Sequence, residues 1–259
     1  MFKISKLEDS RYDRGMIKVT TKEGMVSKWS DFLSSRRSFG EIMSIGYGNS
    51  KNSIKLPMKF SPDLAYLLGA LIGDGCVQGP IKRGKGGRYW RISFSGEMPF
   101  LRREIYPLFL RLFGHQPRFT KKKNRERSWH MNIDSVIIYR FFNRVLGVPY
   151  GEKKNLSRTL RRLSIPRRYF KYFLAGLMDT DGHVSNYVNL TQKDKLFLSK
   201  IMYESRNILG IDFKGPHVNK KVLGVTVAWC LTIHSKSGIK DFISIVPLRY
   251  KQGPVAQLG

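Results

Sequence analysis

The chain has 259 residues, and 41% of them are hydrophobic, which is enough apolar mass for a packed core and excludes disorder as the overall state. Its charge is strongly unbalanced, with 47 Lys and Arg against 19 Asp and Glu and a net charge of +28. A compact chain this basic repels itself unless it binds polyanions, so nucleic acid is the favoured partner and an anionic membrane is the alternative.

Simple features of the chain argue against a membrane or secreted protein. No apolar run approaches the ~20 residues that a membrane span requires, and residues 1–12 lack the apolar block of a secretory signal. Cys76 and Cys230 are too few for a disulfide framework or the usual four-ligand zinc site. The sequence therefore predicts an intracellular protein that binds no membrane.

Residues 1–57 form an N-terminal extension that precedes an internal repeat. Within residues 29–56, an apolar stretch around Ile42 is followed by Gly46-Tyr47-Gly48 and then by a polar segment. This order loosely fits a helix-turn-helix, whose polar second helix enters a DNA groove. The favoured alternative is an extension that caps the first copy of the repeat.

The chain repeats itself after this extension. Residues 67–75 read LLGALIGDG, and residues 174–182 read LAGLMDTDG, 107 positions later. A second similarity relates residues 129–135 to residues 229–235 at an offset of 100. Between the two repeated segments, the first copy is therefore 7 residues longer than the second. We place the extra residues in the Gly/Lys/Arg-rich loop 79–88. The predicted domains are the first copy at 58–147, a linker at 148–165 and the second copy at 166–259.

The residue pattern of each copy predicts secondary-structure elements in the order α-β-β-α-β-β-α. Ser61 and Pro62 have the residue types of a helix cap and first position, and Pro166 opens the second copy. Strands are predicted at 88–95 and 184–191, where polar and apolar residues alternate. Their inward faces hold Trp90, Ile92 and Phe94 in the first copy and Val184, Val188 and Leu190 in the second. Further helices are expected at 98–113, 135–146, 193–209 and 236–246.

Both copies place an acid, Asp74 or Asp181, at the end of the motif helix. A helix C-terminus carries about −0.5 charge, so a carboxylate there is disfavoured unless it binds a cation. Gly75 and Gly182 are expected to take the left-handed conformation that ends a helix. For a single motif, a plain Asp-Gly turn would be the favoured interpretation.

Small residues four positions apart, Gly69 with Gly73 and Gly176 with Thr180, would let the two motif helices pack closely. Their C-terminal ends would then meet and bring the two aspartates side by side. Carboxylates that close repel unless a divalent metal neutralises them, and an all-oxygen site favours Mg²⁺ over zinc. In a basic protein this predicts phosphodiester hydrolysis. The alternative is two core helices with incidental Asp-Gly ends.

The two segments resemble the LAGLIDADG motif, and residues 60–250 are similar to a single-chain homing endonuclease with two such motifs. The second copy matches eight of the nine letters when Met178 counts as Ile, and it differs at Thr180. The first copy is looser, with Ile72 where the motif has its first acid.

The resemblance implies an α+β fold: a pseudo-symmetric pair of αββαββα repeats forms two antiparallel sheets in a DNA-binding saddle, with the motif helices packed at the centre. It also implies a metal held by Asp74 and Asp181, with the backbone carbonyls of Gly73 and Thr180 completing the shell. Mg²⁺ would be the ion, Mn²⁺ would substitute, and Ca²⁺ would support binding without cleavage. Asp179 matches the earlier, non-catalytic acid of the motif.

The resemblance implies an intron-encoded enzyme that cuts both DNA strands at a specific site. The cut would cross the minor groove and leave short 3′ overhangs. The partner would be double-stranded DNA with a long asymmetric site, bound by a monomer. Two alternatives share the fold: a DNA-binding regulator that does not cut, and a maturase that binds its own intron RNA. Both motif acids are present, which argues against the regulator, whereas a maturase can keep them.

The family often has polar and basic residues around the active centre, and Gln192, Lys193 and Lys236 match that pattern. The resemblance implies that Gln192 and Lys236 polarise water or the scissile phosphate. In the first copy the corresponding places are Ser95-Gly96 and Val136, which predicts unequal surroundings for the two acids. The alternative for Lys236 is a surface lysine at a helix start.

Outward-facing strand residues are expected to read bases, and clustered basic residues to contact phosphates. Arg91 suits guanine, and Asn132 and Asn189 suit adenine. The base-reading set is Tyr89, Arg91, Ser93, His130, Asn132, Tyr187, Asn189, Thr226 and Thr232. The phosphate set is Lys82, Arg83, Lys85, Lys121, Lys122, Lys123 and Arg125, and Lys193 also lies in the predicted DNA interface. The alternative for the base-reading set is a solvated sheet face.

Overall fold

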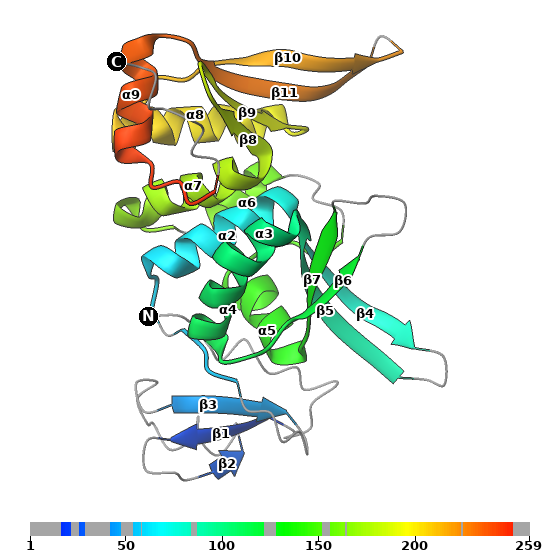
Figure 1. Ribbon diagram of the computed structural model, residues 1–259. Coiled ribbons are helices and arrows are strands. Elements are labelled where there is room, and N and C mark those ends of the chain that lie inside the picture. The colour runs from blue at the N-terminus through cyan, green and yellow to red at the C-terminus, as the bar shows by residue number, and fades with distance from the viewer. Residues whose placement is uncertain are drawn as a thin grey trace. The chain divides into compact units, whose positions relative to one another are not determined.

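The computed structural model (Figure 1) describes residues 17–21, 26–28, 42–47, 54–57, 59–83, 87–121, 128–151, 156–163, 165–223 and 225–250. The chain divides into two compact units. The first comprises Met1–Phe60 and Cys76–Gly151, and the second comprises Ser61–Gly75 and Glu152–Gly259. The first motif helix thus belongs to the same unit as the second. No helix in the described ranges is long and apolar enough to cross a bilayer.

The described part of the N-terminal extension is a three-stranded sheet of order β2-β1-β3, with β1 at Ile17–Thr21, β2 at Val26–Lys28 and β3 at Ile42–Tyr47. The predicted helix around Ile42 is therefore wrong, because these residues pair with β1 as a strand. Ile45 is fully buried and exchanges backbone hydrogen bonds of 2.7 and 2.9 Å with Ile54. Gly46 and Tyr47 of the predicted turn also belong to β3, and Ile54 of the predicted second helix forms a β-bridge with Ile45, whereas residues 48–53 lie outside the described residues.

The first unit contains a four-stranded sheet of order β4-β5-β7-β6. Its strands are β4 (Gly75–Arg83), β5 (Gly87–Gly96), β6 (Arg118–Lys121) and β7 (Trp129–Asp134). The predicted helix 98–113 is one helical run, α3 (Met98–Phe100), η3 (Leu101–Ile105) and α4 (Tyr106–Phe113). The predicted helix 135–146 is α5 (Val136–Arg140) with η4 (Phe141–Val145).

The core of this unit is aromatic. Ile92 and Phe94 of β5 are buried as predicted, whereas Trp90 is only partly buried. Phe113 packs against the rings of Phe109 and Phe142 at centroid distances of 4.6 and 5.6 Å. The expected loop at 79–88 is largely wrong, because residues up to Arg83 continue strand β4 and lengthen the β4–β5 hairpin.

The second unit repeats this topology with the order β8-β9-β11-β10. The strands are β8 (Gly182–Val184), β9 (Val188–Gln192), β10 (Lys214–Val222) and β11 (Val225–Ile233). The single strand predicted at 184–191 is in fact a hairpin that turns at residues 185–187. Val184, Val188 and Leu190 are nevertheless buried as expected. Helices α8 (Lys195–Leu209) and α9 (Lys236–Ile245) confirm the last two predicted helices.

The predicted linker contains a helix, α6 (Leu156–Leu163), that packs on α8. One carboxylate serves both helices, because Asp194 accepts hydrogen bonds from the backbone N–H of Phe197 at 3.0 Å and of Ser157 at 3.2 Å. Lys200 donates to the Ser157 carbonyl at 2.7 Å. The sequence did not indicate this helix, because its few apolar residues lie among basic ones. Of these apolar residues, Leu156 and Leu163 are buried.

Candidate functional site

The site is built on two helices of the second unit, α2 (Pro62–Asp74) and α7 (Phe170–Asp181), which pack on each other. A methyl group on Gly69 would lie 2.0 Å from the Phe173 carbonyl oxygen, and one on Gly176 would lie 2.0 Å from the Tyr66 carbonyl oxygen. The two contacts exchange under the 107-residue offset, so they are related by a pseudo-two-fold axis. The backbones touch because neither crossing residue has a side chain.

The C-terminal ends of the two helices also meet. A methyl group on Gly73 would lie 1.9 Å from Thr180 Oγ1 and 3.0 Å from Asp181 Oδ2. The Thr180 hydroxyl is turned back onto its own helix, where it bonds the carbonyls of Gly176 at 3.1 Å and Leu177 at 2.9 Å. Gly73 therefore leaves the space that the Thr180 side chain occupies, and the Asp181 carboxylate lies beside it.

Each helix passes directly into a strand through its motif glycine. Gly75 has φ −90° and Gly182 has φ −96°, so the expected left-handed conformation is wrong at both positions. The glycines are needed for space instead, because a methyl group at Gly75 would lie 2.7 Å from the Leu71 carbonyl oxygen, and one at Gly182 would lie 2.6 Å from that of Met178.

The two motif acids have different surroundings. Asp74 is exposed, whereas Asp181 is half-buried and accepts a short hydrogen bond from the Gln192 side-chain amide. Strand register shows that Gly96 is the counterpart of Gln192 in the first copy. Trp129 and Trp229 are equivalent residues of the two copies, and Gly96 pairs with Trp129 as Gln192 pairs with Trp229. The expected match to Ser95 is thus wrong by one residue. Because Gly96 has no side chain, the first copy has no equivalent of the Gln192 amide.

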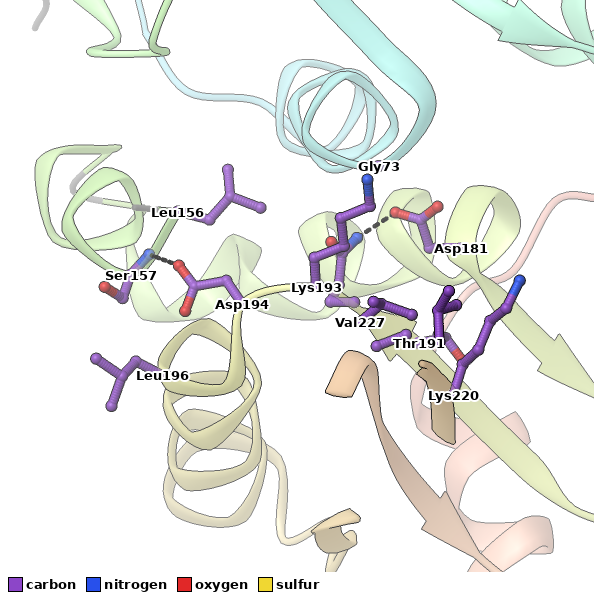
Figure 2. A pocket seen from close by; sticks show the side chains of 13 residues that line it. Gly73, Leu156, Ser157, Asp181, Thr191, Lys193, Asp194, Leu196, Lys220 and Val227 are labelled. Carbon is purple, nitrogen blue, oxygen red and sulfur yellow. Dashed lines mark hydrogen bonds between the residues drawn. The ribbon is translucent and has the colours of Figure 1, made fainter. Parts of the chain in front are cut away.

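Asp181 and Gly73 lie on the wall of a pocket of about 1200 Å³ (Figure 2). Lys193 and Lys220 also line it, and both are exposed. Lys220 was missed by the sequence analysis, because only the pairing of β10 with β11 brings it to this wall. Lys236 occupies the first position of α9, after the capping Ser235, and is not among the residues that line the pocket.

Asp179, the earlier motif acid of the second copy, is an anchor for the C-terminal segment. It is 1% exposed and accepts hydrogen bonds from the Tyr66 hydroxyl at 2.7 Å, Arg249 N–H at 2.8 Å and Tyr250 N–H at 3.3 Å. Its carboxylate is thus occupied by three donors inside the protein, and Ile72 takes its place in the first copy. No cluster of three or more His, Cys, Asp or Glu side chains suited to a metal occurs within the described ranges.

The outer face of the first sheet carries an ordered polar network. Arg91 forms two hydrogen bonds with Asp134, of 2.7 and 3.1 Å, and Arg118 pairs with the same carboxylate. Asn132 donates to the Thr120 hydroxyl at 2.8 Å. His130 and Ser95 share a hydrogen bond of 2.9 Å. The strand residues predicted to read bases therefore lie on one face, but Ser93 and Asn132 are only 8% and 7% exposed.

On the second sheet, Asn189 lies opposite Thr232 and accepts a hydrogen bond of 3.2 Å from Thr191. Tyr187 lies between two histidine rings, with centroids 5.2 Å from His183 and 6.0 Å from His234. His183 was not predicted, because strand β8 is too short to show an alternating pattern, and His234 directly follows β11. Thr226 lies opposite Lys221.

Fewer of the predicted phosphate contacts can be placed. Lys121 is exposed at the end of β6. Lys82 and Arg83 belong to strand β4. The remaining members, Lys85, Lys122, Lys123 and Arg125, lie outside the described residues.

Asp134 is expected to make the first sheet sensitive to acid. Burial alone raises the pKa of Asp134, but its hydrogen bonds and charge interactions with Arg91 and Arg118 outweigh burial and hold the pKa below its usual value. A carboxyl group with a lowered pKa stabilises the fold above its unfolded-state pKa, and this contribution disappears as the pH falls through the folded-state pKa.

We therefore expect Asp134→Asn to unfold at lower urea concentration than the wild type at neutral pH. The difference between their urea midpoints should become smaller below about pH 4. Urea unfolding at several pH values measures this. A difference in urea midpoint that stays constant down to acid pH would contradict an ionic origin of the stabilisation by Asp134. Exposed Asp241, changed to Asn, is the control.

The fold of this chain is the α+β fold of the LAGLIDADG homing endonucleases, with two four-stranded antiparallel sheets and helices. Among solved structures it is similar to the homing endonuclease I-DmoI. Mesophilic variants of I-DmoI give a TM-score of 0.57 at 19% identity, covering 73% of this chain and 93% of that one. I-DmoI in complex with DNA and Ca gives 0.56 at 20% identity, covering 71% and 88%. No protein-family model and no curated protein matches the sequence.

Proposed function

We propose that this chain is a divalent-metal-dependent DNA endonuclease that cuts both strands of a long, asymmetric site as a monomer and leaves short 3′ overhangs. The observation that carries the proposal is the meeting of the two motif helices at their C-terminal ends, where Gly73 packs against Thr180 and lies beside the Asp181 carboxylate. One chain supplies both helices, so no second copy is needed to assemble the site.

The residues at the helix ends fit a hard divalent cation. Carboxylates at Asp74 and Asp181 and backbone carbonyls at Gly73 and Thr180 offer only oxygen, the donor that Mg²⁺ and Mn²⁺ prefer. They sit at the negative ends of two helix dipoles, which favours a cation there. A bound divalent ion would polarise the scissile phosphate and acidify water. A variant of I-DmoI has been crystallised with its target DNA in the presence of Mg, and I-DmoI with DNA and Mn.

The chain's own polar residues would orient the reactants. Gln192 donates to Asp181 Oδ2 and so holds the carboxylate in one orientation. Lys193 and Lys220, on the same pocket wall, would bind the phosphates on either side of the scissile bond. Lys236 would act from outside this wall, on water or the phosphate. The polar faces of both sheets would read bases, and the net charge of +28 would attract the duplex.

The test is cleavage of a plasmid library with random inserts by the purified chain. We expect double-strand breaks at one family of sequences in Mg²⁺ or Mn²⁺, retention of DNA without cleavage in Ca²⁺, and no cleavage in EDTA. Sequencing of the ends would reveal the overhang. Cleavage that persists in EDTA would contradict the metal. Tight, sequence-selective binding without cleavage in any ion would favour a non-cleaving regulator, and selective binding of intron RNA alone would favour a maturase.

A further inference from the structure

The β10–β11 hairpin of the second unit extends beyond its own sheet. Strand β9 pairs with β11 only from Trp229 to Ile233. Among the described residues, the outer part of β11 therefore pairs with β10 alone, from Lys221 opposite Thr226 to Val222 opposite Val225. The result is a projecting two-stranded ribbon (Figure 1). A ribbon of this kind is narrow enough to enter a DNA groove.

The tip of this ribbon is apolar and open to solvent. Leu223 is 99% exposed, Val225 is 66% exposed and Val222 is 47% exposed. Leu223 has φ +49°, and in the described part of the chain it is the only residue other than glycine with a positive φ. Leucine is uncommon in this conformation because its Cβ crowds the backbone, and glycine or asparagine fits more easily. The chain thus keeps a bulky apolar group where local structure favours a small or polar residue.

Positive charge lies directly behind the apolar tip. Lys220 and Lys221 precede Val222 on β10, and both are exposed. An anionic membrane also binds apolar side chains flanked by lysines, but Lys220 lines the same pocket as Asp181, which ties this surface to the candidate site and its DNA. DNA uses both, because phosphates bind lysines while an apolar wedge between base steps opens the stack.

We propose that Leu223 is a wedge that enters the DNA stack beside the cleavage site, held there by phosphate contacts from Lys220 and Lys221. This inference rests on the proposed DNA-binding function and adds a deformation of the target to it. Lys220 also lines the pocket that contains Asp181, so the wedge and the candidate site share one wall through β10. Base steps that unstack easily at the wedge would be favoured without any base-edge contact.

The two kinds of contact differ in their dependence on salt. Phosphate contacts release counterions, so losing one lysine lowers the slope of log K against log salt by about 0.9. Insertion of an apolar side chain releases none, so its loss weakens binding by the same factor at every salt concentration. The probe is a duplex selected from a random library by retention on the wild-type protein in Ca²⁺, with 2-aminopurine placed at successive steps.

We expect the wild type to increase 2-aminopurine fluorescence at one step. Leu223→Asn should fold at least as well, because asparagine tolerates positive φ, yet lose the signal and bind about tenfold more weakly with an unchanged salt slope. Leu223→Met should keep the signal, and Lys221→Ala should keep it with a smaller slope. Tyr203→Ala is the control, because Tyr203 is a large side chain that is likewise exposed, at 65%, but belongs to α8 rather than to the hairpin.

Different failures separate the two proposals. A wild type that retains no duplex from the library rejects the proposed function itself. A wild type that binds DNA while Leu223→Asn matches it in fluorescence and affinity rejects only the wedge. A wild type that sediments as a dimer, with Leu223→Asn a monomer, would assign the tip to self-association and also overturn the wedge.

Discussion

Replacing Asp74 or Asp181 by asparagine is expected to lower the rate of DNA cleavage by at least about 1,000-fold, while binding in Ca²⁺ stays within a few-fold of wild type. The amide keeps the shape of the side chain and removes the charge that holds a divalent ion. Single-turnover cleavage of the selected duplex measures the rate, and retention in Ca²⁺ measures binding.

Stability separates this effect from misfolding. Asp74 is exposed at the negative end of α2, so its neutralisation should raise the free energy of unfolding by about 0.3–1 kcal/mol. If the Asp74→Asn variant is more stable than the wild type but inactive, Asp74 serves the reaction rather than the stability of the fold. Asp212→Asn is the matched control, because Asp212 is an exposed acid that pairs with Lys214. Near-wild-type cleavage by either motif variant would reject the assignment of the site.

Gly176→Ala and Gly69→Ala are expected to destabilise the protein by about 3 kcal/mol each and to reduce cleavage as well. The added methyl group would lie 2.0 Å from a backbone carbonyl oxygen of the facing helix, and backbone cannot rotate away as a side chain can. The helices must separate, and the Gly73–Asp181 contact then opens.

Urea unfolding of the full chain and cleavage of the selected duplex measure the two effects. Ser244→Ala on the exposed side of α9 is the control, and it should change stability by less than about 0.5 kcal/mol. If the glycine variants were as stable as this control, the close crossing of α2 and α7 would not be the packing in solution.

Local signals predicted most of the helices and strands. Ser61 caps α2 through a hydrogen bond of 3.2 Å to Leu64 N–H, as its residue type indicated. The alternation in β5 identified the buried Ile92 and Phe94. Short elements escaped this approach: β8 has three residues and α6 has eight, so neither shows enough periods to stand out.

The candidate site was predicted in part. The two aspartates and the small residues that let their helices meet came from the repeat itself. The partner of Asp181 was named, but its counterpart in the first copy was misplaced by one residue. That correspondence depends on strand register, which is set by pairing between distant segments. Asp179 illustrates the same limit, because its donors Arg249 and Tyr250 are 70 and 71 residues away.

The duplication, the positions of the two motif acids and the order of elements follow from the amino-acid sequence, because repeats, caps and periodicity are patterns in the order of residues. Tertiary structure alone decided which glycine touches which carbonyl, that Lys220 shares a wall with Asp181, and that Leu223 stands exposed at a hairpin tip. These facts depend on close packing and register between segments far apart in the chain, and no single stretch of residues encodes them.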